Sequence, residues 1–133
     1  MPRSFSIDSI THGIEVAVRS ARSNPTGRAL RMVQREGADL IRELDGLADD
    51  LQDFDLDRSA ERDVSVEISL ARDLAASIVA DMRDVLDYDN EPDLYEDDTD
   101  RDNSAREFLD NVMENLRDLK GNHLRAIRRA LKQ

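Results

Sequence analysis

The sequence predicts an all-α fold: an antiparallel bundle of four helices, or five if the last is divided, with two long central helices and an acidic loop before the last helix. Apolar residues recur at intervals of three and four along most of the chain, which is the period of an amphipathic helix. These series are interrupted where Pro, Gly or several Asp residues gather. A chain of 133 residues suits one domain of ordinary size, so we expect residues 1–133 to form a single helical domain.

The first helix is expected at residues 8–23. Apolar or small side chains follow one another there at intervals of three and four, starting with Ile10 and Ile14. Asp8 or Ser9 is placed to cap its N-terminus, because each side chain has an oxygen that accepts a hydrogen bond from a free backbone N–H of the first turn.

The second helix, expected at residues 25–54, has the clearest pattern in the sequence. Asn24 is placed to cap it and Pro25 to be its first residue, where the missing N–H has no partner to lose. Its apolar or small positions, separated alternately by three and four residues, are Leu30, Val33, Gly37, Leu40, Leu44, Leu47, Leu51 and Phe54. This repeat predicts a partner helix at a shallow crossing angle, with Gly37 permitting a close approach. The partner is a helix of the same chain or, alternatively, the same seam of a second copy in a homodimer.

The third helix is expected at residues 59–86, with Asp57 or Ser59 as its N-cap. Its apolar positions are Val64, Ile68, Ala71, Ala75, Ile78, Met82 and Val85. Residues 64–70 also alternate in polarity as a strand would. We predict a helix there, because the same seam continues beyond them and the sequence offers no second strand for pairing.

An acidic loop is expected at residues 87–103, which show no helical period, contain Pro92 and carry nine acidic side chains. The alternate spacing of Asp87, Asp89, Glu91 and Asp93 is that of a calcium loop. Pro92 stands at the position where such a loop needs Gly for its turn, so the calcium interpretation fails. No metal and no cofactor are expected.

The last helical region follows this loop. Residues 104–107, Ser-Ala-Arg-Glu, form a capping box before a helix at 104–120. Gly121 is placed to end that helix, and Asn122 to cap a short final helix at 122–132. The alternative is a single kinked helix.

Composition excludes several classes of function. The chain has no Cys, hence no disulfide scaffold, thiol nucleophile or thiolate metal site, and its two His residues leave little for zinc. No apolar run approaches the length of a membrane span, and the first residues lack the apolar core of a signal peptide. Gly-rich phosphate loops and hydrolase motifs are also missing. We therefore expect a cytoplasmic, non-enzymatic protein with no membrane partner.

Charge is distributed in blocks along the chain. Bases outnumber acids by six to two in residues 1–35 and by seven to four in residues 103–133. Acids outnumber bases by nine to two in residues 36–58, by six to three in 59–84 and by nine to one in 85–102. The net charge is −11, so the strongly acidic middle dominates two basic ends.

An enzymatic alternative rests on residues 117–123, Arg-Asp-Leu-Lys-Gly-Asn-His. This stretch resembles the Arg-x(4–6)-His motif of HEPN-type ribonucleases, which are all-helical and use the pair across a dimer interface on RNA without a metal. The resemblance implies that Arg117 stabilises phosphate charge and that His123 moves the proton of a ribose hydroxyl.

The excess of carboxylates leads to the main functional hypothesis, a non-enzymatic inhibitor or regulator that occupies a basic, nucleic-acid-binding surface of a partner protein as a DNA mimic. In composition the chain is similar to small acidic helical inhibitors encoded by phages, including anti-CRISPR and anti-restriction proteins. The partner-binding carboxylates are expected in two zones: Asp49, Asp50, Asp53, Asp55 and Asp57, and then Asp87, Asp89, Glu91, Asp93, Glu96, Asp97, Asp98, Asp100 and Asp102. Direct binding of nucleic acid is not favoured, because the net charge repels it. A homodimeric structural or adaptor protein is the remaining alternative.

Overall fold

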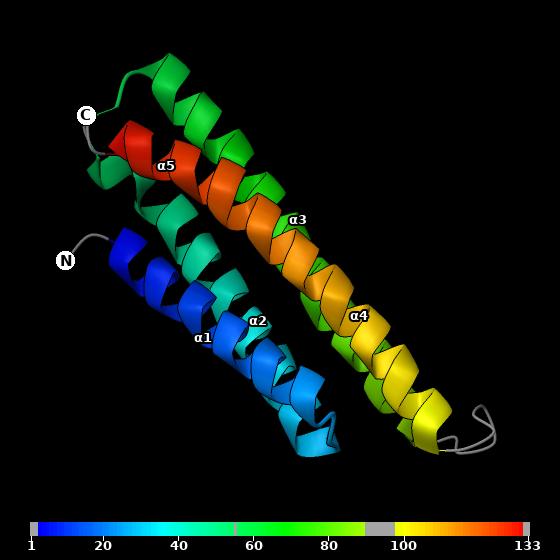
Figure 1. Cartoon of the computed structure of the whole chain (residues 1–133). Helices are drawn as coiled ribbons and strands as arrows, with labels where there is room; N and C mark the ends of the chain where they lie inside the picture. The colour runs from blue at the N-terminus through cyan, green and yellow to red at the C-terminus, as the bar shows by residue number, and fades with distance from the viewer. Residues whose placement is uncertain (1–2, 55, 90–97, 132–133) are drawn as a thin grey trace.

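The computed structural model describes residues 3–54, 56–89 and 98–131, and most of them are helical. In chain order the elements are α1 (Arg3–Ser23), α2 (Gly27–Asp50), the 3-10 turn η1 (Leu51–Asp53), α3 (Arg58–Asp89), α4 (Asp98–Asp118), the π-helical turn η3 (Leu119–His123) and α5 (Leu124–Leu131). Successive long helices run in opposite directions, and α4, η3 and α5 together form the fourth rod of the bundle (Figure 1). The predicted all-α antiparallel bundle is confirmed.

The four rods pack in an up-and-down order. α2 lies against α1 and α3, and the fourth rod completes the bundle by contacting both α1 and α3. The connection from α2 to α3 lies at the same end as α5 and the first turns of α1, whereas the turn from α1 to α2 and the start of α4 lie at the opposite end (Figure 1). Short connections produce this order, because they leave consecutive helices adjacent and antiparallel.

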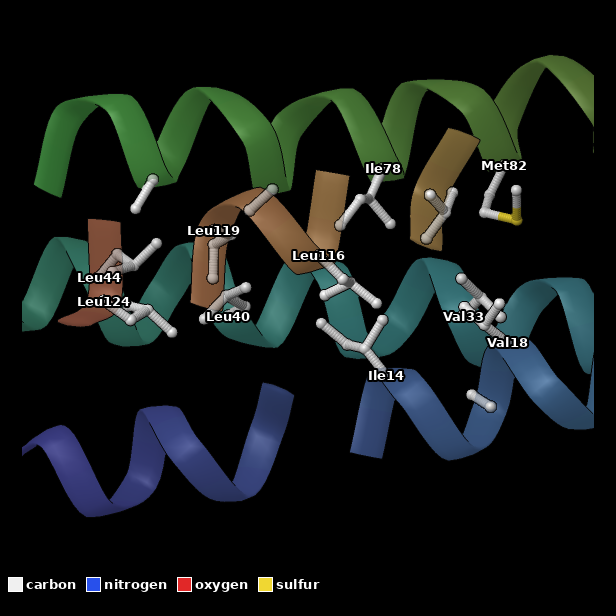
Figure 2. Packing of buried hydrophobic residues seen from close by; sticks show 14 of the residues in the cluster. Ile14, Val18, Val33, Leu40, Leu44, Ile78, Met82, Leu116, Leu119 and Leu124 are labelled. Atoms are coloured by element: carbon white, nitrogen blue, oxygen red, sulfur yellow. The ribbon is translucent and has the colours of Figure 1, made fainter. Parts of the chain in front are cut away.

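The interior is apolar and is built from one face of every helix. The predicted seam of α2 and η1 is buried over seven of its positions, namely Leu30, Val33, Gly37, Leu40, Leu44, Leu47 and Leu51. Figure 2 shows it facing Ile14 and Val18 of α1, Ile78 and Met82 of α3, and Leu116, Leu119 and Leu124 of the fourth rod. Full burial of one such side chain contributes about 1.5–3 kcal/mol to the free energy of folding. The residues at three-and-four spacing are therefore a main source of the stability of the bundle.

Helices of the same chain cover the α2 seam completely. Leu40, Leu44 and Leu47 have 0% of their surface exposed. A homodimer formed through this seam would therefore require the bundle to open.

Gly37 lies where α2 comes close to α3. A methyl group built on its α carbon would lie 3.1 Å from Val79 Cγ2 and 3.3 Å from Ile78 Cγ2. Contacts this short require a neighbour to shift, and Ile78 is fully buried. The predicted close approach is therefore confirmed.

The starts of the first two helices differ from the prediction. α1 begins at Arg3 instead of residue 8, so both caps proposed near that position lie inside the helix. α2 is capped by Thr26 and not by Asn24: Thr26 has extended backbone, and its Oγ1 accepts a hydrogen bond from the Ala29 N–H at 3.1 Å. Pro25 precedes the cap instead of opening the helix.

The connection from α2 to α3 is partly as predicted. α2 ends at Asp50 and η1 continues the chain for three residues, so Phe54 lies beyond the helix and is half-buried. The predicted cap Asp57 is confirmed, because its Oδ1 accepts a hydrogen bond from the Ala60 N–H at 2.7 Å. Residues 64–70 are helical despite their strand-like alternation.

The predicted acidic loop at 87–103 is wrong at both ends. α3 continues to Asp89 and α4 already begins at Asp98, so residues 104–107 lie inside a helix and are not a capping box. Acidic residues favour the first turn of a helix because they interact with the positive end of its dipole. Three of the first five residues of α4 are Asp, a composition that suits the start of a helix as well as a loop.

The fourth rod changes its register once, at the π turn η3. Its buried residues follow at intervals of three and four as far as Leu119, but five residues separate Leu119 from Leu124. The π turn absorbs this extra residue and keeps Leu124 and Ile127 in the core, at 5% and 2% exposure. Among the described glycines none has a positive φ, so Gly121 does not end a helix. The predicted break between 104–120 and 122–132 is therefore wrong, and the single irregular helix is the correct alternative.

Candidate functional site

The first predicted zone of carboxylates lies at the connection between α2 and α3. Asp49 and Asp53 are exposed and Asp50 is half-buried. Asp57 is also exposed, but its carboxylate caps α3 and so has a structural role as well. Asp55 lies outside the described residues. We call Asp49, Asp53 and Asp57 the acidic tip.

The second predicted zone is divided between two helices and the segment that joins them. Asp87 and Asp89 lie in the last turn of α3, and Asp98, Asp100 and Asp102 in the first turns of α4. Asp102 is half-buried. The remaining predicted acids, Glu91, Asp93, Glu96 and Asp97, lie outside the described residues.

Several other carboxylates form ion pairs that connect or brace the chain's own helices. The pairs are Arg22 with Asp110 at 2.8 Å, Arg72 with Asp45 at 2.7 Å, Lys120 with Glu15 at 2.7 Å, and Arg42 with Asp39. Within the part of the chain that the structure describes, Asp49 and Asp53 take part in no ion pair. The tip therefore keeps at least two carboxylates that the protein does not neutralise itself.

A further set of acids on α4 was missed by sequence reasoning. Glu107, Glu114 and Asp118 are exposed, and spacings of seven and four residues place them on one outer face of the helix. The sequence indicates them by the helical spacing of the acidic residues themselves, which the spacing of the apolar residues does not reveal. We call these three residues the α4 ridge.

The basic C-terminal helix lies at the same end of the bundle as the acidic tip. α5 packs against α3 and reaches the end where α2 connects to α3 (Figure 1). Arg125 and Arg129 are exposed on it, and Arg128 is half-buried. This end of the molecule therefore carries both signs of charge, which the charge blocks along the sequence did not reveal.

One histidine is held by a carboxylate across two helices. His123 Nδ1 lies 2.7 Å from Glu67 Oε2, and the two side chains are 17% and 32% exposed. Because a carboxylate only accepts, Nδ1 carries the proton and donates it. His123 Nε2 lies 3.9 Å from the nearest oxygen of Asp118, beyond hydrogen-bond distance. Nε2 is therefore the nitrogen left for other chemistry.

The residues of the ribonuclease-like motif do not converge within one chain. Arg117 lines a hollow beside Glu15 of α1, whereas His123 lines a second hollow beside Glu67 of α3. The fourth rod shares one hollow with α1 and the other with α3, and Gly121 borders both. The side chains that do share a hollow with His123 include Arg125 and Arg129.

Asp81 on α3 is an acid in an unfavourable setting. Burial raises the pKa of its carboxyl above the ordinary value, and the negative charge of Asp84, one turn further along the helix, raises it as well. The folded state therefore disfavours the ionised form of Asp81.

The described residues include no group of three or more His, Asp or Glu side chains arranged to hold a metal ion. The helices that these residues form include none with the length and apolar character needed to cross a membrane.

Comparison with family models, with curated proteins and with solved structures finds no match to this chain.

Proposed function

We propose that the protein is a cytoplasmic, non-enzymatic regulator whose carboxylates bind a basic, nucleic-acid-binding surface of a partner protein. The observation that carries this proposal is the exposure of Asp49 and Asp53, which form no ion pair within the described residues, on a chain of net charge −11. The apolar core already accounts for folding, and like charges gathered on a surface oppose the compact state. These carboxylates do not stabilise the fold, but they would stabilise a complex with a basic partner.

The α4 ridge adds a pair of closely spaced charges to the same proposal. Glu114 and Asp118 are four residues apart, which corresponds to a rise of about 6 Å along a helix. Two nucleotide steps of one DNA strand rise about 7 Å along the duplex axis, at about 3.4 Å per step. A straight helix with acids at this interval therefore presents negative charge at a spacing that a DNA-binding groove accommodates.

The test is competition between this chain and duplex DNA for a basic partner. Proteins captured by the immobilised chain are eluted with duplex DNA, and the eluted protein is titrated with labelled DNA in the presence of wild type or variants. Neutralising the tip by Asp49→Asn, Asp53→Asn and Asp57→Asn should weaken competition at least tenfold, since Asn at position 57 still caps α3. The matched control, Asp39→Asn, Asp45→Asn and Asp110→Asn, removes the same charge from acids that the chain pairs internally, and should weaken it less than threefold.

Three results would contradict the proposal. One is failure of duplex DNA to elute the captured protein. Another is equal loss of competition in both triple variants, which would reduce the effect to net charge alone. The third is binding that does not weaken as salt rises from 50 to 300 mM, because contacts between exposed charges are screened over about 8–10 Å at physiological salt.

A second candidate function is the metal-independent ribonuclease. The Glu67–His123 contact favours it, because a carboxylate that holds an imidazole by Nδ1 is the usual arrangement of a general base. Incubation with structured RNA in the presence of a chelator should give cleavage by wild type and by His12→Ala, whose site is an exposed histidine on α1. His123→Ala should give none. Absence of cleavage by wild type, or equal cleavage by His123→Ala, removes this candidate.

A third candidate is a homodimeric structural or adaptor protein. Because the chain covers the α2 seam itself, the dimer would need an exposed surface instead, and the apolar side chains Val66 and Leu70 of α3 are 52% and 43% exposed. Sedimentation equilibrium at micromolar concentration separates the cases, since a 15.1 kDa species excludes the dimer.

A further inference from the structure

A hollow of about 350 Å³ lies between α3 and the end of the fourth rod. Glu67 lines it from α3, His123 and Asn122 line it from the π turn, and Arg125 and Arg129 line it from α5. These residues come from sequence segments more than 50 positions apart, and the packing of the fourth rod on α3 brings them together.

The two arginines favour an anion as the occupant. Arg125 and Arg129 are exposed, lie one helical turn apart, and form no ion pair among the residues that the structure describes. Like charges four residues apart on a helix repel each other, so an anion between them would relieve an unfavourable contact. Guanidinium groups also match the geometry of phosphate oxygens, with two parallel N–H donors each.

The nearby carboxylates are already engaged. Glu67 faces His123 Nδ1 at 2.7 Å, and Asp118 Oδ1 accepts a hydrogen bond from the Asn122 side-chain amide. Gly121 leaves one edge of the hollow open, because no atom outside its own stretch of helix lies within 4 Å of the place where a side chain would begin. The hollow therefore offers the guanidinium donors of Arg125 and Arg129 to a small anionic group.

We propose that this hollow binds a phosphate group, as carried by a nucleoside monophosphate or another phosphomonoester. Its volume falls within the range of about 300–1,000 Å³ that is usual for small-ligand sites, larger than a free phosphate ion requires. The imidazole of His123 is the one aromatic ring among the residues that line it, and the lining has no Phe, Tyr or Trp on which a base would stack, so recognition rests on the phosphate. The site uses the basic end of the fourth rod and does not depend on the proposed binding of a basic partner by the acidic tip.

The experiment is an NMR titration of the full chain with sodium phosphate and with AMP, against sodium chloride at matched ionic strength. The side-chain Nε–H signals of Arg125 and Arg129 and the ring protons of His123 should shift saturably with both phosphate compounds. Chloride should leave them in place. Arg125→Gln with Arg129→Gln should weaken binding at least tenfold. The control Arg31→Gln with Arg35→Gln removes the same charge from two exposed arginines one turn apart on α2 and should change binding less than twofold.

Both arginines are exposed, so the double variant is expected to fold, and its thermal melt and amide spectrum verify this independently of binding. Equal shifts with chloride, equal binding by the double variant, or binding of phosphate without binding of AMP would overturn the proposal. The last result would describe a free ion held by surface charge and not a site for a phosphomonoester.

Discussion

The imidazole of His123 and the carboxylate of Glu67 are joined by a 2.7 Å contact between Nδ1 and Oε2, which connects the π turn to α3. The contact is partly shielded from solvent, with the two side chains 17% and 32% exposed. The same turn is also held by apolar packing, because Leu119 at its start and Leu124 just after its end are buried in the core. The contact also restricts the orientation of the imidazole ring in the hollow that His123 lines.

Removing either partner of this contact should destabilise the bundle. Glu67→Ala and His123→Ala should each lower the free energy of unfolding by about 1–2 kcal/mol, with a coupling of about 1 kcal/mol in a double-mutant cycle. Urea denaturation at pH 7 measures all four proteins. Glu114→Ala, an exposed acid on the α4 ridge, is the control and should change stability by less than about 0.5 kcal/mol. Strict additivity of the two single effects would show that the contact contributes nothing.

Asp81→Asn should stabilise the protein at neutral pH. Because the folded-state pKa of Asp81 is raised, the folded state binds this proton more tightly than the unfolded state does. The contribution of the Asp81 carboxyl to stability is therefore lost as the pH rises from its ordinary pKa of 3.8 through its raised folded-state pKa. Asn has no ionisable group, so the Asp81→Asn variant avoids that loss. The gain should stay below about 1 kcal/mol, because solvent screens this partly exposed group.

Thermal melts at pH 7 and pH 3 measure the effect of Asp81→Asn. The stabilisation should be present at pH 7 and absent at pH 3, where the wild-type carboxyl is protonated in both states. Asp73→Asn, on the same helix but exposed, should change little at either pH. Stabilisation of equal size at both pH values would contradict the electrostatic explanation.

Two glycines should respond oppositely to Ala. Gly121→Ala should raise the free energy of unfolding by about 0.5–1 kcal/mol, since Ala favours helix and nothing lies within 4 Å of the added methyl group. Gly37→Ala brings a methyl group to 3.1 Å from Val79, so its propensity gain should be cancelled or reversed, and Gly37→Val should cost about 1–3 kcal/mol. Denaturant unfolding ranks the three variants. A Gly37→Ala protein as stable as Gly121→Ala would show that α2 and α3 separate easily.

The register shift at the π turn predicts that Leu119 is essential to the core. Leu119→Ala should cost about 2–5 kcal/mol, because the side chain has 0% exposure and the cavity would lie at the centre of the bundle. Leu70→Ala, which makes the same change at a side chain 43% exposed on α3, should cost less than about 1 kcal/mol. Equal melting temperatures for the two variants would mean that the π turn is not packed as described.

Asp57 should contribute to stability through its hydrogen bond and not through its charge. Asp57→Ala removes the cap of α3 and should cost about 1 kcal/mol, whereas Asp57→Asn keeps an acceptor oxygen and should be nearly neutral. Helical circular dichroism during thermal unfolding compares the two variants. If Asn costs as much as Ala, the carboxylate acts by charge, and the tip variant used in the competition experiment needs Asp at this position.

Local chemistry was sufficient to predict those parts of the fold that depend on a few neighbouring residues. The apolar spacing of α2 predicted its buried seam, because burial selects the helical period. Capping residues near each expected helix start predicted one cap correctly, at Asp57. The caps expected at Asp8 or Ser9 and at Ser104 lie inside helices, and the one expected at Asn24 is provided by Thr26 two positions later. The start of α4 was misjudged because a run of acids suits both a solvated loop and the first turn of a helix.

The sequence by itself determined the class of fold, the residues of the core and the acidic character of the surface, because each follows from period or composition. Only the tertiary structure decided that the fourth rod passes through a π turn, that Glu67 meets His123, and that Arg125 and Arg129 share their hollow. The reason is physical: these contacts join segments far apart in the chain, and their geometry depends on how α3 and the fourth rod settle against a common core. The pattern of residues along one helix does not indicate which side chains of a neighbouring helix lie opposite to it.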